Sequence, residues 1–127
     1  MALFGKRSRG EKRGDQAEQQ ARAFLQQQGL VFIAANVKGP GGEIDLIMRE
    51  RQTLVFVEVR LRSNQHFSSA AESVNASKQN KLLRTAAWYL QQQKLTDEIP
   101  CRFDVVALST LDESQPPQWI TDAFGTA

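Results

Sequence analysis

The strongest constraint on the fold is a pair of β-strand patterns, residues 43–49 and 54–61, joined by a short charged turn. The second pattern opens with LVFVEV, the most apolar run of the chain, which is typical of a central strand. Because side chains alternate between the two faces of a strand, each strand has one apolar face. In the first strand that face carries Ile44, Leu46 and Met48. The patterns therefore predict a hairpin whose other face carries charge.

Two acidic residues of this hairpin are predicted to face each other. A hairpin that closes with Arg49 opposite Leu54 places Asp45 opposite Glu58, and directly opposed side chains have Cβ atoms about 4.5–5.5 Å apart. Two carboxylates at that separation repel each other unless a proton or a cation lies between them. Oxygen ligands in a compact site suit Mg²⁺ or Mn²⁺ better than zinc. Asp45 and Glu58 are therefore candidate ligands of a divalent metal ion.

Two features leave this hypothesis open. The turn has no Asn-Gly or Asp-Gly pair to fix its geometry, and a slip of one residue would move every partner to the other face. Asp45 and Glu58 can also be explained as edge-strand carboxylates that face water, with Arg60 and Arg62 as surface ion-pair partners. Glu58 argues against that alternative, because it interrupts the most apolar run and an unpaired buried charge is costly.

A third acidic residue is expected from a first helix over residues 15–28. The apolar stripe of this helix consists of Ala17, Ala21, Phe24 and Leu25. Glu18 lies about 20° from Leu25 around a helix of 3.6 residues per turn, so it leans toward the stripe. Taken alone, Glu18 is explained by solvent exposure or by an ion pair with Arg22 at i+4. Beside the two strand carboxylates it becomes a candidate third acidic ligand.

The remaining patterns complete a single α/β domain. Residues 30–37 and 101–109 are predicted strands, residues 77–93 a second helix, residues 63–73 a polar loop, and residues 119–124 a short last element. The order α-β-β-β-α-β predicts a mixed central sheet flanked by helices. A chain of 127 residues suits one such domain, over residues 14–127, after a basic arm over residues 1–13.

The composition also limits the cellular setting. No apolar run approaches the roughly 20 residues that span a bilayer, and no apolar segment follows the basic residues of the N-terminus, as a secretory signal requires. Cys101 is the only cysteine, which rules out an intrachain disulfide and fits a reducing compartment. We therefore expect a cytoplasmic protein that does not associate with membranes.

Basic residues gather in two places. The arm over residues 1–13 holds five basic side chains, Lys12 and Arg13 among them, against one acidic side chain. Such an arm favours contact with nucleic acid, although a disordered, solubilising tail explains it equally well. The second helix carries a cationic stripe at the spacing i, i+3, i+6, which consists of Lys78, Lys81 and Arg84. A solvated helix flank is the alternative explanation of this stripe.

The acidic residues together resemble a known active-site pattern. A helix glutamate, then an aspartate, then E-x-K on the next strand is the pattern of the restriction-endonuclease-like (PD-(D/E)xK) nuclease superfamily, which includes archaeal Holliday-junction resolvases. More closely, the chain resembles the uncharacterised bacterial YraN family over most of residues 14–108. The matching stretches are GDQAEQQARAFLQQQGL, AANVKGPGGEIDLIMRE, TLVFVEVRLRS, SVNASKQNKLLRTAAWYL and CRFDVVAL.

The resemblance implies a restriction-endonuclease-like αβββαβ core with a metal-dependent phosphodiesterase site. By position, Glu18 corresponds to the helix acid, Asp45 to the metal-bridging acid and Glu58 to the acid of E-x-K. The resemblance also implies that the second helix packs close to the active-site sheet, where Lys78 or Gln79 would reach a phosphate or a metal-bound water. Junction-cutting relatives act as dimers, so a homodimer is expected by analogy.

Arg60 departs from the superfamily pattern, which has lysine at this position. An arginine cannot act as a base, because its pKa exceeds about 12, but it can hold a phosphate and stabilise developing charge. Glu43, which faces Arg60 in the predicted register, is expected to support Arg60 rather than bind metal.

Two functions therefore compete. The leading hypothesis is a metal-dependent nuclease that acts on DNA, including branched or recombination and repair intermediates, with Arg62 and the two basic regions holding the backbone. The main alternative is a non-catalytic nucleic-acid-binding module on the same fold, which the arginine at position 60 favours. A protein-interaction adaptor with a decayed site ranks third.

Overall fold

The computed structural model describes residues 9–61, 74–95 and 99–124. Its elements are α1 (Arg9–Gln27), β1 (Val31–Gly39), β2 (Gly42–Glu50), β3 (Thr53–Leu61), α2 (Ala76–Gln92), β4 (Cys101–Leu108) and β5 (Gln118–Phe124). The strands form one five-stranded sheet in the order β1-β2-β3-β4-β5. Strands β3 and β4 pair in parallel and the other neighbours pair antiparallel. The expected α/β class and the αβββαβ order are confirmed, with β5 as the last element.

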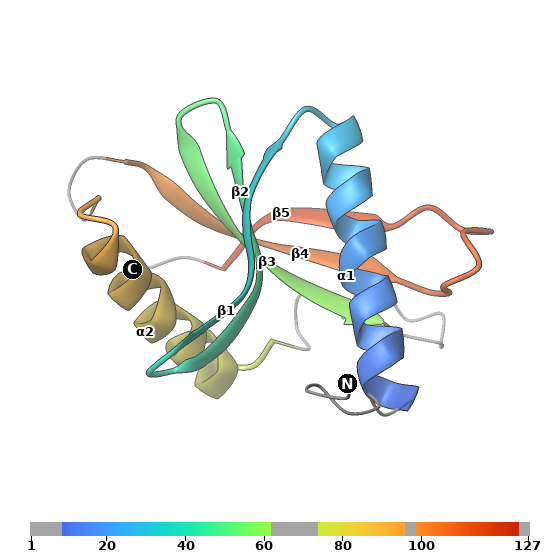
Figure 1. Ribbon diagram of the computed structural model, residues 1–127, viewed down its shortest axis with the longest axis horizontal. Coiled ribbons are helices and arrows are strands. Elements are labelled where there is room, and N and C mark those ends of the chain that lie inside the picture. Colours follow the sequence, from blue (N-terminus) through green and yellow to red (C-terminus); the bar gives the residue numbers. More distant parts are fainter. Residues whose placement is uncertain (1–8, 62–73, 96–98, 125–127) are drawn as a thin grey trace, which may run out of the picture.

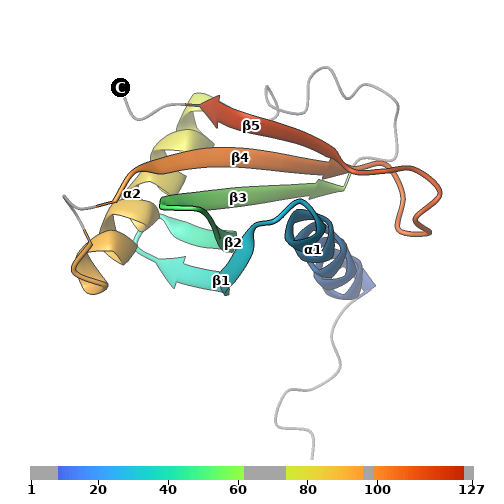
Figure 2. The same ribbon diagram turned by 90° about the horizontal axis from the view of Figure 1, so that it is seen from above.

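The two helices cover opposite faces of the sheet (Figures 1 and 2). On one face, the expected stripe of α1 is buried through Ala17, Ala21 and Leu25, which pack against residues of β2, β3 and β4. On the other face, α2 buries Leu82 and Ala86 against the same strands. No helix within the described ranges is long and apolar enough to cross a membrane.

Helix α1 begins at Arg9, well before the expected start at Asp15. The helix runs through Gly14, whose cost of about 1 kcal/mol relative to alanine is modest beside the good helix formers around it. Residues 9–13 of the expected basic arm therefore lie in α1, and residues 1–8 lie outside the described part of the chain. The loop expected over residues 63–73 also lies outside it.

The sheet opens into a fork between β2 and β3. The expected register is confirmed, with Arg49 opposite Leu54, but the β2–β3 ladder ends at the pair Leu46–Val57. Beyond this pair β2 stays on β1 as far as Gly42, while β3 stays on β4 as far as Leu61. Figure 1 shows the consequence, because the β1–β2 hairpin bends toward α2 while β3 runs toward the start of α1.

The prediction that Ile44 shares a face with Leu46 and Met48 is wrong. Leu46 and Met48 pack on the α1 side of the sheet, whereas Ile44 packs on the α2 side. The neighbouring strand makes the same switch opposite Asp45, where Asn36 has a positive φ of 54°. Asn tolerates this left-handed conformation better than most residues do, so the strands can twist here and exchange faces.

The β1–β2 turn packs against α2, and this contact fixes the part of the β1–β2 hairpin that has separated from β3. The Gly41 N–H donates to Thr85 Oγ1 at 3.0 Å, and the buried Thr85 hydroxyl donates to the carbonyl of Gly42 at 3.1 Å. A Cβ on Gly41 would lie 2.0 Å from the backbone carbonyl oxygen of Lys81. Only glycine therefore fits where the turn meets the helix.

The β4–β5 pair is tied by a buried carboxylate. Asp104 is fully buried and accepts from the Arg102 guanidinium at 3.0 Å, from Trp119 Nε1 at 2.9 Å and from the Asp122 N–H at 2.9 Å. Arg102 also donates to Glu50 Oε1 at 2.6 Å. The Asp104 carboxylate is therefore satisfied, and pairing with Arg102 accounts for its place in the strand.

We expect Gly41→Ala to destabilise the fold, because the new methyl group meets backbone that cannot move aside. Overpacking of this kind costs about 1–3 kcal/mol in the free energy of unfolding, measurable by urea denaturation. Gly14→Ala is the matched control, since a Cβ there meets nothing within 4 Å. In α1 this control should stabilise the chain by up to about 1 kcal/mol. Equal stability of the two variants would contradict the close approach of the turn to α2.

Candidate active site

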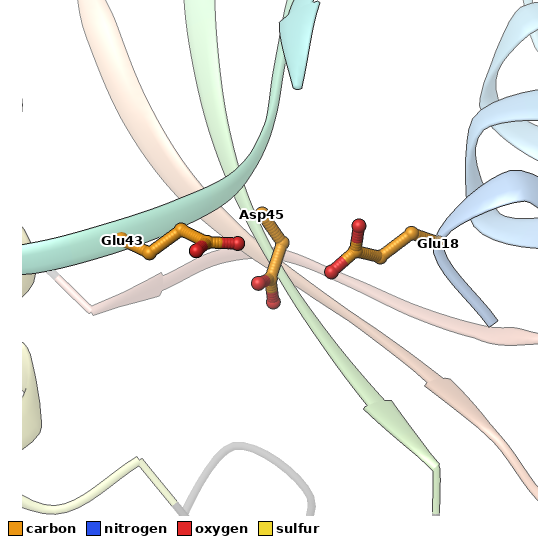
Figure 3. Close-up of side chains that lie close together, drawn as sticks. All are labelled: Glu18, Glu43 and Asp45. Atoms are coloured by element: carbon orange, nitrogen blue, oxygen red, sulfur yellow. The ribbon is translucent and has the colours of Figure 1, made fainter. Parts of the chain in front are cut away.

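Four carboxylates from three elements converge where β2 leaves β3. Glu18 comes from α1, Glu43 and Asp45 from β2, and Glu58 from β3. Glu18, Glu43 and Asp45 each place an oxygen within 4.8 Å of the others. Figure 3 shows Asp45 between Glu43 and Glu18, which approach it from opposite sides. We call these three residues the acidic cluster.

The Asp45 carboxylate is built into the fork. Its Oδ2 accepts from the backbone N–H of Val59 at 2.8 Å, one residue beyond Glu58 and past the end of the β2–β3 ladder. The Asp45 side chain thus accepts the hydrogen bond that the backbone of β2 would accept if the ladder continued. Asp45 and Glu58 lie immediately beyond the last ladder pair, as the register requires, but the strands part there.

Glu43 lies elsewhere than expected. Its Oε1 accepts from Asn36 Nδ2 at 2.7 Å, and its backbone pairs with Lys38 of β1. The predicted support of Arg60 by Glu43 is wrong, because β2 follows β1 away from β3 at the fork. Arg60 lies beside Glu58 instead, with its Nε 3.7 Å from Glu58 Oε1.

The Glu58 carboxylate is buried and incompletely paired. Its side chain is 7% exposed, and its Oε1 lies 3.7 Å from Lys78 Nζ as well as from Arg60 Nε. These distances are long for hydrogen bonds. Within the described part of the chain, Glu58 Oε2 and Arg60 Nε are buried without a hydrogen-bond partner. Most buried polar atoms have such a partner, so these two are exceptions among the described residues.

Burial and mutual repulsion raise the pKa values of these acids. Burial, reinforced by the charge of Glu58, raises the pKa of Asp45 to about 7, against the opposing hydrogen bond from Val59. Burial likewise raises the pKa of Glu18 to about 7, although its hydrogen bond from Asn36 opposes the shift. Burial also raises the pKa of Glu58, opposed by Lys78 and Arg60. Asp45 and Glu18 therefore titrate near neutral pH, where a cation can displace their protons.

Asn36 also belongs to this site, although the sequence patterns did not predict it. Its Nδ2 donates to Glu18 Oε1 at 2.8 Å and to Glu43 Oε1 at 2.7 Å, so one amide joins α1 to β2. A signal was present, because asparagine is depleted in strands and Asn36 interrupts an apolar strand pattern.

An open pocket of about 430 Å³ adjoins the acidic cluster between α1 and β1. Its lining residues are Asp15, Glu18, Gln19, Arg22, Ala35, Asn36 and Leu46. Arg22 places its guanidinium 3.5 Å from the ring centre of Phe32, and Glu18 accepts from Asn36. The pocket therefore reaches Glu18 and Asn36 at the edge of the acidic cluster.

The predicted nucleic-acid-binding residues fall into three groups. Lys78 reaches Glu58, whereas Gln79 donates to the carbonyl of Val74 at 2.7 Å and so holds the start of α2. Lys81 and Arg84 are exposed along α2. The side chains of Lys12 and Arg13, although in α1, and all of Arg62 lie outside the described residues.

Comparison with known proteins identifies the family. A family model described as "Uncharacterised protein family UPF0102" matches residues 17–108, which contain the acidic cluster and Glu58. The chain is 49% identical over 122 residues to a UPF0102 protein of Enterobacter sp. (strain 638), covering 95% of this chain and 89% of the relative. It is 53% identical over 112 residues to the UPF0102 proteins named YraN of Escherichia fergusonii and Shigella sonnei, covering 87% of this chain and 82% of each relative. The chain therefore belongs to the UPF0102 family.

Proposed function

We propose that this chain is a divalent-metal-dependent nuclease that hydrolyses phosphodiester bonds of DNA, acting in the cytoplasm on branched or recombination and repair intermediates. The observation that carries the proposal is the buried Glu58 carboxylate, whose Oε2 has no partner in the described residues, beside an Asp45 with a pKa raised to about 7. A fold that buries the Glu58 carboxylate beside a partly buried Asp45, and pairs Glu58 incompletely, loses stability by doing so. Such a loss is typical of functional sites.

The donor atoms at the fork fit Mg²⁺ or Mn²⁺. The fork offers carboxylate oxygens and no thiolate or imidazole within the described residues, and hard divalent cations prefer oxygen. Asp45 and Glu58 would hold the ion, with Glu18 as a further ligand. When bound, the ion supplies Lewis acidity and lowers the pKa of a coordinated water.

Two basic side chains near Glu58, Arg60 and Lys78, would bind the phosphate. Arg60 is permanently charged and its buried Nε lacks a partner among the described residues, so it offers a donor to a phosphate oxygen. Lys78 is 40% exposed and only 3.7 Å from Glu58, so it can exchange the carboxylate for a phosphate. Lys81 and Arg84 extend the same helix surface and would hold the DNA backbone without reading its sequence.

Arg60 also supports a second candidate function, a non-catalytic nucleic-acid-binding module. An arginine cannot accept a proton from the attacking water, which the lysine of the resembling superfamily could do. Asp45, Glu18 and Glu58 have raised pKa values, but each lies at least partly buried beside other acids that would bind the same cation. On this reading the fork would bind a cation and the phosphate backbone without cutting it.

We expect the purified chain to cleave DNA in the presence of Mn²⁺ or Mg²⁺ and to be inactive in EDTA. Branched, single-stranded and duplex DNA should be compared in a gel assay. Asp45→Asn and Glu58→Gln should each lower the rate by more than about a hundredfold, since loss of a group behind a metal ligand alone costs 10–100-fold. Glu113→Gln, an exposed carboxylate in the β4–β5 connection, is the charge-matched control.

Three results separate the candidates. Cleavage that survives unchanged in both fork variants would refute the assignment of the site. Salt-sensitive DNA binding without cleavage would select the binding module. Arg60→Lys sharpens the choice, because metal-dependent cutting gained only by that variant would show that the arginine disables the site.

We expect Asp45→Asn to stabilise the metal-free chain at pH 8. The pKa of Asp45 rises from 3.8 to about 7 on folding, so the folded state binds the extra proton and stability falls as pH rises between these values. Asparagine carries no charge and can still accept from the Val59 N–H. The gain at pH 8 should be at least about 1 kcal/mol in the free energy of unfolding, and it should vanish near pH 4. Urea denaturation across pH measures it, and a pH-independent loss of stability would contradict the shifted pKa.

A further inference from the structure

We propose that Asn36 is a positioning residue that holds Glu18 and Glu43 beside Asp45 and thereby sets the metal affinity of the fork. This inference rests on the proposed function, because it assumes that the acids bind a divalent ion. It adds a residue that neither the E-x-K pattern nor the family comparison marks, and it gives Glu43 a place in the site.

The hydrogen bonds of Asn36 define its orientation. Both partners are carboxylate oxygens, at 2.8 Å on Glu18 and 2.7 Å on Glu43. The amide nitrogen faces both acids and donates to each, as suits carboxylates in their ionised form, which only accept hydrogen bonds. Both hydrogens of the amide are thereby used, one on each acid. The amide contacts one oxygen of each acid, Oε1, and makes no hydrogen bond to the other.

The Asn36 amide opposes the repulsion that would separate the acids. Glu18 sits on a helix and Glu43 on a strand, and in the described residues Asn36 is the side chain that donates to both. Without the amide, each carboxylate gains by turning to solvent, because like charges at this separation repel. Partners behind metal ligands orient the ligands in this way and typically contribute 10–100-fold to metal affinity.

The backbone of Asn36 allows its side chain to be tested separately. Its φ of 54° lies in the left-handed region, which glycine adopts without strain. Asn36 is also exposed, so its removal leaves no cavity in the core. Asn36→Gly therefore removes both hydrogen bonds while keeping the twist of the strand. Arg51→Gly is the matched control, because Arg51 is exposed, has a φ of 55° and lies in the turn at the far end of β2.

The experiment is a calorimetric titration of Mn²⁺ into the full-length wild-type chain, Asn36→Gly and Arg51→Gly, with thermal unfolding of each metal-free protein. We expect Asn36→Gly to bind Mn²⁺ about 10–100-fold more weakly than wild type, while its melting temperature stays the same or rises. Arg51→Gly should bind Mn²⁺ as wild type does. Equal affinity of Asn36→Gly and wild type would overturn the role of Asn36. Absence of Mn²⁺ binding by the wild-type chain would overturn the proposed metal site itself.

A second measurement needs no variant that might misfold. In the wild-type chain, saturating Mg²⁺ should shift the side-chain amide resonances of Asn36 in a ¹⁵N-correlated NMR spectrum. The amide of Asn80, which is exposed on α2, serves as the internal reference. If Mg²⁺ binds and the Asn36 amide does not move, the amide does not hold the ligands.

Discussion

The hydrogen bond from the Val59 N–H to the Asp45 carboxylate organises the site, because it lies where the sheet divides. The β2–β3 ladder ends one pair earlier, at Leu46–Val57. Because the Asp45 side chain replaces the next backbone pairing, β2 can follow β1 toward α2 while β3 remains paired with β4. This separation opens space between two central strands that a continuous ladder would close. Glu18 from α1 and Lys78 from α2 approach the same opening from either side of the sheet.

The fork gives up stability, as the proposed metal site would require. Burial raises the pKa values of Asp45, Glu18 and Glu58 together, and neither Lys78 nor Arg60 comes within hydrogen-bonding distance of Glu58. In contrast, the buried Asp104 carboxylate is fully paired, since it accepts from Arg102, Trp119 and the Asp122 backbone. Two buried carboxylates in one sheet, one satisfied and one not, show that incomplete pairing is a local property of the fork. Local departures of this kind are expected at functional or strained sites.

The alternation of side chains along the strands and the β2–β3 register predicted much of this site. The twist of β1 and β2 could not be predicted in this way. The Arg49–Leu54 register was an assumption that the turn sequence could not fix, and the structure confirms it, with Asp45 and Glu58 just beyond the last pair of the ladder. A pattern of strict alternation could not show that β1 and β2 change faces at Asn36 and Asp45, so it misplaced Ile44 and assigned Glu43 to Arg60. The contact between Glu18 and Asn36 joins a helix to a strand, and no short-range spacing encodes it. Likewise, Gln79 resembled a phosphate ligand by position, but its amide is used at the start of α2.

The central claim is that Asp45 and Glu58 share a divalent cation at the strand fork. The most direct test is an anomalous difference map from crystals of the wild-type chain soaked in Mn²⁺. The account predicts a peak within about 2.5 Å of a carboxylate oxygen from each of these two residues, as expected for oxygen ligands of a divalent cation. A fully soaked crystal with no peak at the fork, or with a peak that touches neither Asp45 nor Glu58, would contradict it.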